Sequence, residues 1–183
     1  MVRTVMMTLT AVALSILSVG CMGRIISEGM GGARGASGKV VEVGMTPDLT
    51  KYKSLAIEGI TVAAGLQAPS EMPAMIGSDL AAAAQKRGLM TEGQPGLKLS
   101  GQIVHYESSS TVDTAIGPLE EVIVRAKLTD AQSGSVVAEA NLVGRSKATS
   151  SSGPKNVSEG VGKALDKWLK DGGLKTAGEK DKD

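Results

Sequence analysis

The chain has 183 residues and an almost balanced charge, with 20 Lys and Arg against 19 Asp and Glu. This balance excludes a nucleic-acid partner, because phosphate binding needs a cationic surface. The chain also has one His and one Cys, too few for a Cys/His zinc site or for thiol catalysis beside a His base. We therefore expect neither a metal nor a cofactor.

Residues 1–20, MVRTVMMTLTAVALSILSVG, have the layout of a secretory signal peptide. Arg3 is their one charged residue, residues 5–19 are apolar, Thr or Ser, and small residues follow. A membrane-spanning helix is the alternative, but it needs about 20 mostly apolar residues, and this run is shorter. We predict that residues 1–20 are removed, which takes away Arg3 and leaves the remaining chain with equal numbers of cations and acids.

Cys21 follows the apolar run directly. The sequence Leu17-Ser18-Val19-Gly20-Cys21 resembles the lipobox of bacterial lipoproteins, with its leucine one place earlier than usual. The resemblance implies diacylglycerol on the sulfur of Cys21, a new N-terminus there, and further acylation with palmitate. A free cysteine is the alternative, although unpaired thiols are sparse in exported proteins. Met22 stands where Asp retains enterobacterial lipoproteins in the inner membrane, so the resemblance implies the periplasmic face of the outer membrane.

Beyond Cys21 the composition divides the chain into three parts. Residues 21–38 are rich in glycine and predict a flexible tether between the lipid and the folded body. Residues 39–170 have the length and the apolar patterning of a single domain. Residues 171–183 end in alternating charges and predict a disordered, solvated tail.

The predicted domain opens with a strand at residues 52–62, which a short strand at 39–43 precedes. A helix is expected over residues 71–87, with Gly88 as its C-terminal cap. Its apolar face contains Met72, Ile76, Leu80, Ala83 and Ala84. Residues 97–107, 120–130 and 135–146 alternate apolar and polar side chains, which is typical of antiparallel strands with one buried face. Asp130 and Gly134 favour a hairpin turn between the last two.

A second helix is predicted over residues 156–173, with Asn156 and Glu159 as a capping box. Its apolar stripe includes Trp168, which we expect in the core because the chain has no Phe. A ligand-stacking role for Trp168 is the alternative. The elements together predict an α+β domain of order β-α-β-β-β-α. This domain would have two layers: a roughly four-stranded, largely antiparallel sheet with both helices on one face.

Candidate catalytic residues are few. His105, Ser108 and Asp113 suggest a Ser-His-Asp triad, but His105 and Ser108 point to opposite faces of an extended strand, and no nucleophile elbow accompanies them. The glycine-rich stretch before the domain lacks the spacing of a phosphate-binding loop. Glu120, Glu121 and Glu139 are expected on a solvated strand face. We predict no catalytic residue, no metal ligand and no enzymatic activity.

The body also resembles a group of small bacterial lipoproteins known mainly as a domain family of unknown function. The shared segments are residues 51–57 (KYKSLAI), 86–89 (KRGL), 99–103 (LSGQI) and 128–134 (LTDAQSG). The resemblance implies a non-catalytic binding or assembly module whose partners are the membrane, through Cys21, and another envelope protein. One alternative is a subunit of an oligomeric secretion or transport assembly. The other is an envelope hydrolase that uses carboxylates or His105.

Overall fold

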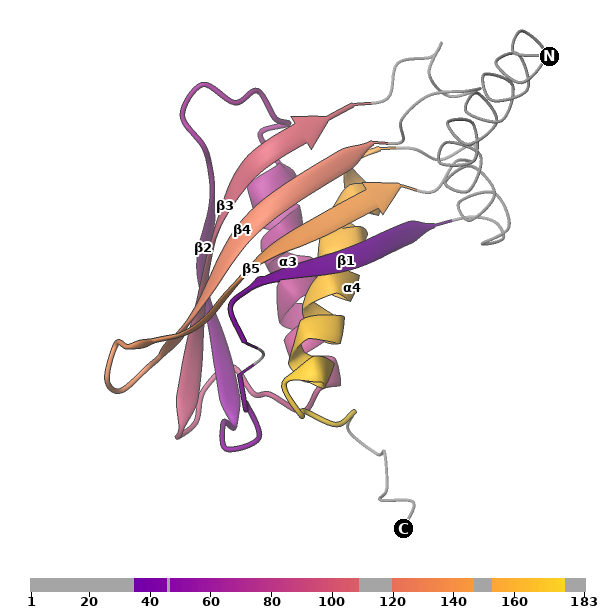
Figure 1. Cartoon of the computed structure of the whole chain (residues 1–183). Coiled ribbons are helices and arrows are strands. Elements are labelled where there is room, and N and C mark those ends of the chain that lie inside the picture. The colour runs from indigo at the N-terminus through magenta and orange to yellow at the C-terminus, as the bar shows by residue number, and fades with distance from the viewer. Residues whose placement is uncertain (1–34, 46, 109–119, 147–152, 177–183) are drawn as a thin grey trace, which may run out of the picture. The chain divides into compact units, whose positions relative to one another are not determined.

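The computed structural model describes residues 35–45, 47–108, 120–146 and 153–176 (Figure 1). Within these ranges the chain forms five strands and two helices. In chain order they are β1 (Ala36–Val43), β2 (Ser54–Val62), α3 (Met72–Lys86), β3 (Gly96–Glu107), β4 (Glu121–Asp130), β5 (Val136–Ser146) and α4 (Pro154–Asp171). The predicted signal peptide, Cys21 and residues 22–34 of the predicted tether lie outside the described residues, whereas residues 36–38 of that tether belong to β1.

The five strands form one sheet in the order β1-β5-β4-β3-β2. All neighbours are antiparallel except β2 and β3, which run parallel because the chain crosses over through α3 between them. The predicted α+β class, the helical layer and the largely antiparallel sheet are confirmed, and the predicted order β-α-β-β-β-α holds from β2 onward. The sheet has five strands where roughly four were predicted. The short strand expected at 39–43 is a full edge strand, and β2 departs from the expected antiparallel pairing.

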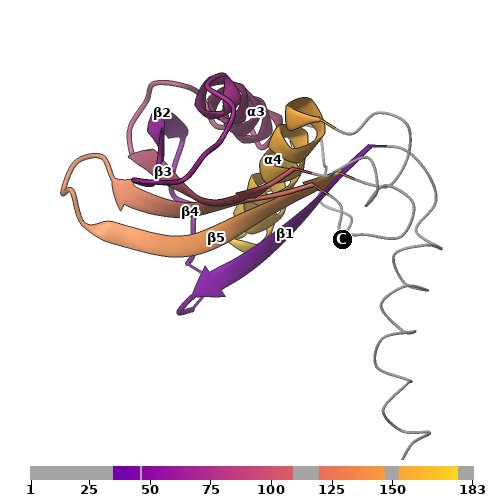
Figure 2. The ribbon, with the colours of Figure 1, turned by 90° about the horizontal axis from the view of Figure 1, so that it is seen from above.

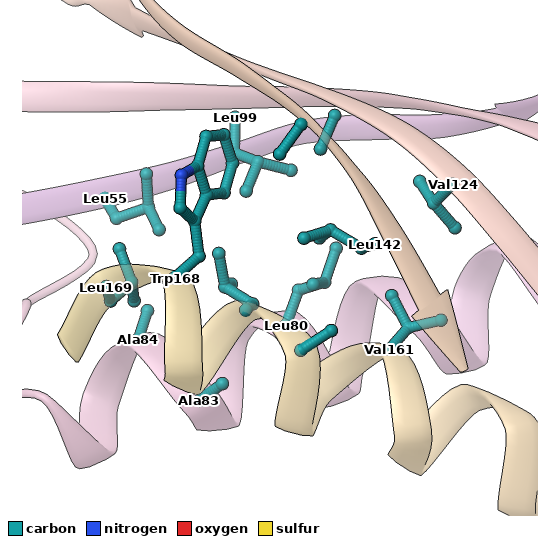
Figure 3. Packing of buried hydrophobic residues seen from close by; sticks show 14 of the residues in the cluster. Leu55, Leu80, Ala83, Ala84, Leu99, Val124, Leu142, Val161, Trp168 and Leu169 are labelled. Carbon is teal, nitrogen blue, oxygen red and sulfur yellow. The ribbon is translucent and has the colours of Figure 1, made fainter. Parts of the chain in front are cut away.

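Both helices lie against the same face of the sheet, as Figure 2 shows from above. The expected faces are confirmed: the predicted core residues of α3 are all buried, and so are alternate residues of β3 and β4. Trp168 is fully buried between α4 and the sheet, close to Leu55, Leu99 and Leu169 (Figure 3). Trp168 is therefore a core residue, and the ligand-stacking alternative is excluded.

Three glycines allow α4 to lie directly on β1 and β5. Gly38 of β1 and Gly144 of β5 face Gly160 of α4, so that backbone meets backbone without side chains between them. A methyl group on Gly160 would lie 2.6 Å from the carbonyl oxygen of Ser37 and 2.8 Å from the Cα of Gly144. A methyl group on Gly144 would overlap the carbonyl oxygen of Val157. We call these three residues the glycine seam.

Helix α4 begins two residues earlier than predicted. Its N-cap is Gly153, and no side chain caps it, so the capping box of Asn156 and Glu159 is wrong. Pro154 occupies the first turn, where its fixed φ suits a helix and its missing N–H would have no partner within the helix. The expected C-terminal cap of α3 is confirmed, since Gly88 has a φ of 72° and its N–H donates to the carbonyl of Gln85. The Asp130 hairpin turn is likewise confirmed, with Gly134 N–H donating to the Asp130 carbonyl.

Replacing a glycine by alanine should lower stability inside the glycine seam and raise it at a helical glycine outside the seam. Gly144→Ala should lower the free energy of unfolding by about 1–3 kcal/mol or more, because the added methyl forces α4 away from β5. Gly77→Ala is the matched control: Gly77 lies within α3 with nothing within 4 Å of the added methyl, and alanine should raise stability by up to about 1 kcal/mol. Urea unfolding of both variants measures this, and equal stabilities would contradict it.

Candidate functional site: the uncovered face of the sheet

The sheet face opposite the helices carries polar side chains in adjacent positions. Pairing places Gln102 of β3, Arg125 of β4 and Asn141 of β5 in one row across the sheet. The next row contains Ser100, Lys127 and Glu139. Because residues paired across neighbouring strands share a face, these six side chains form one continuous polar surface. We call it the polar face.

The polar face contains a shallow hollow of about 600 Å³. Its floor is the backbone of the central strands around Gly101 and Ala126, and β2 forms one side. No aromatic and no large aliphatic side chain lines it. The lining residues are Glu58, Gly59, Thr61, Ser100, Gly101, Gln102, Arg125, Ala126, Lys127 and Glu139. Such a surface presents hydroxyl, amide and charged groups, and so it suits a polar partner better than an apolar one.

Two ion pairs flank the hollow. The ammonium of Lys98 lies 2.6 Å from the carboxylate of Glu58, and that of Lys127 lies 3.3 Å from the carboxylate of Glu139. All four side chains are close to half exposed, so each pair contributes at most about 1 kcal/mol to stability. Their main effect is to neutralise most of the charge on the polar face.

Arg125 is the exception on this face. Its side chain is exposed between Gln102 and Asn141 of the same row, and it makes no ion pair or side-chain hydrogen bond within the part of the chain that the structure describes. A guanidinium presents five N–H donors in a fixed plane and binds carboxylate or phosphate through two parallel hydrogen bonds. Arg125 is therefore the residue of the polar face best placed to bind an anionic group. The sequence placed Arg125 on the polar side of its strand but did not distinguish it from the neighbouring lysines.

His105 also lies on the uncovered face. Strict alternation along β3 would place it with Ile103 on the helix side, but a bulge at Val104 shifts it, so that His105 pairs with Ile123. Its Nε2 is 3.9 Å from the carboxylate of Glu107, and both side chains are about half exposed. Among the described residues no hydrogen bond joins His105 to a hydroxyl group, Ser108 included, and Asp113 lies outside them.

One of the three glutamates that the sequence placed on a solvated face is buried. Glu120 is only 6% exposed, its carboxylate accepts a hydrogen bond from the N–H of Gly153, and its carbonyl accepts one from Ser146. The prediction of a solvated position is therefore wrong for Glu120. Its two hydrogen bonds hold the start of α4 against the end of β5. Burial, followed by the charges of Glu120 and Glu71, raises the pKa of nearby Tyr106. Glu121 and Glu139 do lie on the uncovered face, paired with Arg145 and Lys127.

A buried arginine links the end of α3 to α4. Arg87 is almost fully buried at the end of α3, and its Nε and Nη2 donate to the two carboxylate oxygens of Asp166 at 2.7 and 3.1 Å. Its Nη1 donates to the carbonyl of Leu174 and to Thr176, beyond the end of α4. Burial opposes ionisation of Asp166, but the bonds from Arg87 and Lys86 outweigh it and hold the pKa of the carboxyl below its ordinary value. This is a structural contact, remote in the fold from the polar face.

The described residues contain no group of three or more His, Cys, Asp or Glu side chains that could hold a metal ion. In the same residue ranges, no helix is long and apolar enough to cross a membrane. The one lipidation site that the sequence predicts, Cys21, lies outside the described residues, so its modification stays a prediction.

No protein-family model matches the sequence, and no curated protein matches it either. Among solved structures, the chain is similar to PelC from Paraburkholderia phytofirmans, which forms a dodecamer. One crystal form gives a TM-score of 0.54 at 17% identity, covering 76% of this chain and 99% of PelC. A second form, of a PelC variant, gives 0.53 at 20% identity, covering 72% and 96%. At these identities the likeness shows a common fold.

Two further structures are less similar. A protein of the domain family DUF330 from Xanthomonas campestris has a TM-score of 0.40 at 18% identity, and the alignment covers 68% of this chain and 85% of that one. A candidate lipoprotein from Caulobacter crescentus has a TM-score of 0.38 at 14% identity, covering 64% and 93%. Both scores lie below the range in which a common fold is concluded.

The Arg87–Asp166 contact predicts a loss of stability in acid. Because the pKa of folded Asp166 is depressed, its contribution is fully present above the unfolded value of about 4 and is lost as the pH falls through the folded pKa. Asp166→Asn should lower the free energy of unfolding at neutral pH by about 2 kcal/mol, because the buried guanidinium loses a charged acceptor. The variant should also lose less stability than wild type between pH 5 and pH 2. Denaturant unfolding at several pH values measures both effects, and parallel pH profiles would contradict the assignment.

Proposed function

We propose that this protein is a lipid-anchored, non-catalytic binding or assembly module of the cell envelope, on the periplasmic face of the outer membrane. The observation that supports it best is the division of the sheet into a helix-covered face and an uncovered polar face. A face of this kind, mounted on a rigid sheet and preceded in the chain by a predicted lipid anchor, suits the recognition of a neighbouring envelope component.

The chemistry of the polar face indicates what it would recognise. Its ion pairs leave Arg125 as an available cation, while Gln102, Ser100 and Thr61 supply neutral donors and acceptors close by. A partner that presents a carboxylate beside other polar groups would meet both. With mostly paired charges and no aromatic anchor, the face fits a moderate-affinity contact, which attachment to one membrane would strengthen by raising the effective concentration.

A subunit of an oligomeric secretion or transport assembly is the second candidate. The likeness to PelC favours it, because PelC forms a dodecamer. The envelope hydrolase is the weakest of the three, since the described residues around His105 offer no nucleophile.

Lipidation is tested by substitution at the predicted lipobox. Cells grown with radiolabelled palmitate should label the wild-type chain and leave Cys21→Ala unlabelled, because the thioether to diacylglycerol needs the sulfur of Cys21. Met22→Ala is the matched control and should label normally. Equal labelling of wild type and Cys21→Ala would refute the lipid anchor.

The sorting prediction needs its own variant. Met22→Asp should move the labelled protein from the outer-membrane to the inner-membrane fraction on a sucrose gradient, because the resemblance assigns retention to an Asp after the cysteine. Met22→Asn is the control without the charge. An unchanged distribution of Met22→Asp would refute outer-membrane sorting by this rule.

A further inference from the structure

The two edges of the sheet differ in how well they are protected. At one edge, Ser54 of β2 has partners on both sides, Gly96 of β3 and Met90, and the N–H of Leu55 donates to the Met90 carbonyl at 2.9 Å. Farther along β2, the register shifts between Ile57 and Gly59. A covered start and a bulge are two of the devices by which proteins prevent an edge strand from pairing with another chain.

The other edge has neither device. β1 pairs with β5 in unbroken register from Ala36 to Val43, with no bulge and no proline in the strand. Its second side pairs with no other strand of the described residues. Figure 1 shows β1 lying along the border of the sheet. An edge strand that is straight and uncovered offers a row of backbone N–H and C=O groups to an incoming strand.

Most of the exposed side chains of this edge are apolar, with Lys39 as the exception within β1. On the face away from the helices, Val41 is 45% exposed and Val43 is 60% exposed, and Met45 just beyond the strand is 93% exposed. These are three of the five large hydrophobic side chains that are exposed in the described residues. Such a concentration on an unprotected edge marks an interaction site.

We propose that β1 is a self-association edge, at which two copies of this chain pair their β1 strands antiparallel about a two-fold axis. The inference rests on the second candidate function, an oligomeric assembly, and specifies one of its interfaces. A two-fold contact uses the same strand from both copies. It therefore needs no second free edge, and the protected start of β2 leaves none for a head-to-tail contact there.

The charges of β1 restrict the register of this pairing. Residues directly opposite each other in an antiparallel pair lie on the same face of the sheet. If the helices of both copies are to cover the same face of the joint sheet, each residue of one β1 that faces away from the helices must lie opposite a residue of the other β1 that also faces away from them. Pairing centred on Lys39 or on Glu42 would place two like charges against each other, which is destabilising. Pairing centred on Val40 or on Val41 avoids this.

Of the registers that avoid like charges, these two oppose both exposed valines with residues of β1. With Val40 at the centre, Val41 opposes Lys39 of the second copy, whose aliphatic stem can cover it, and Val43 opposes Ser37. With Val41 at the centre, it opposes itself, and Val43 opposes Lys39. In each register the backbone groups on the outer side of the two β1 strands would form hydrogen bonds with one another. A second copy is thus complementary to this edge in backbone, apolar surface and charge.

Disulfide trapping tests the geometry. The full chain with Cys21→Ser, carrying either Val40→Cys or Val41→Cys, is oxidised with copper phenanthroline and run on a non-reducing gel. One of the two should form covalent dimers at least tenfold more than Val136→Cys, the control, which is also an exposed valine but lies at the hairpin end of β5. The more reactive position identifies the register. Equal trapping of all three, or no dimer from either β1 cysteine, would overturn the proposal.

Charge substitution tests whether the edge carries the association. Val41→Lys with Val43→Lys should shift the full chain in detergent from dimer or higher oligomer to monomer by sedimentation velocity, while Val136→Lys should leave the distribution unchanged. Both β1 positions are exposed, so thermal unfolding of the double variant should remain close to wild type. Oligomers that survive the double substitution would overturn the β1 interface and leave the assembly function standing. A wild-type chain that is monomeric throughout would overturn both.

Discussion

The arrangement of this domain depends on the direct contact between α4 and the strands β1 and β5. Gly38, Gly144 and Gly160 make that contact, and a single methyl group at any of them would meet backbone atoms. Without side chains between helix and sheet, α4 sits close enough for Trp168 and the leucines around it to fill the space over the centre of the sheet. The chain has no Phe, so close approach achieves what large aromatic side chains achieve in other small domains.

The close helical layer also explains why the two faces of the sheet differ so strongly. The apolar alternate residues of β3 and β4 lie mainly on the helix side, and most of the side chains on the other side are polar, with Ile123 as an exception. The ion pairs Lys98–Glu58 and Lys127–Glu139 keep that surface soluble without a covering layer. Arg125 takes part in neither of these ion pairs, so its guanidinium is available to bind an anionic group. The buried Arg87–Asp166 pair does different work, because it joins the ends of α3 and α4 to the segment that follows.

Periodicity alone predicted the parts of the fold in which local pattern and tertiary packing agree. Both helices, the strands β3 to β5 and the place of Trp168 follow from it. The sequence pattern did not predict the orientation of a side chain where one extra residue interrupts the alternation of a strand, or where an acidic residue is buried. The bulge at Val104 turns His105 to the other face, which no alternation pattern reveals. Glu120 is an acidic residue that is nevertheless buried, because its carboxylate accepts a hydrogen bond from the backbone of Gly153, far along the chain.

Other failures came from pairing, which is a property of distant segments. The predicted helix between β2 and β3 permits their parallel pairing without requiring it, and nothing near β1 in the sequence indicates that β1 pairs with β5. The polar face was therefore predictable as a set of outward residues on separate strands. Which of these residues are neighbours was not predictable, because the strand register decides that Gln102, Arg125 and Asn141 lie in one row.

The pairing of β1 with β5 has a consequence for the order in which the domain forms. Among the described residues, the first strand of the domain pairs only with the last, from Ala36 with Ser146 to Val43 with Glu139, so β1 cannot form this pairing until most of the chain has been made. Closing so long a loop is slow, and an edge that waits stays available to other molecules. During that interval β1 of one nascent copy could take the place of β1 in another. Exchange of this strand between copies would then be a kinetic hazard of the topology, and slow completion of the chain would increase it.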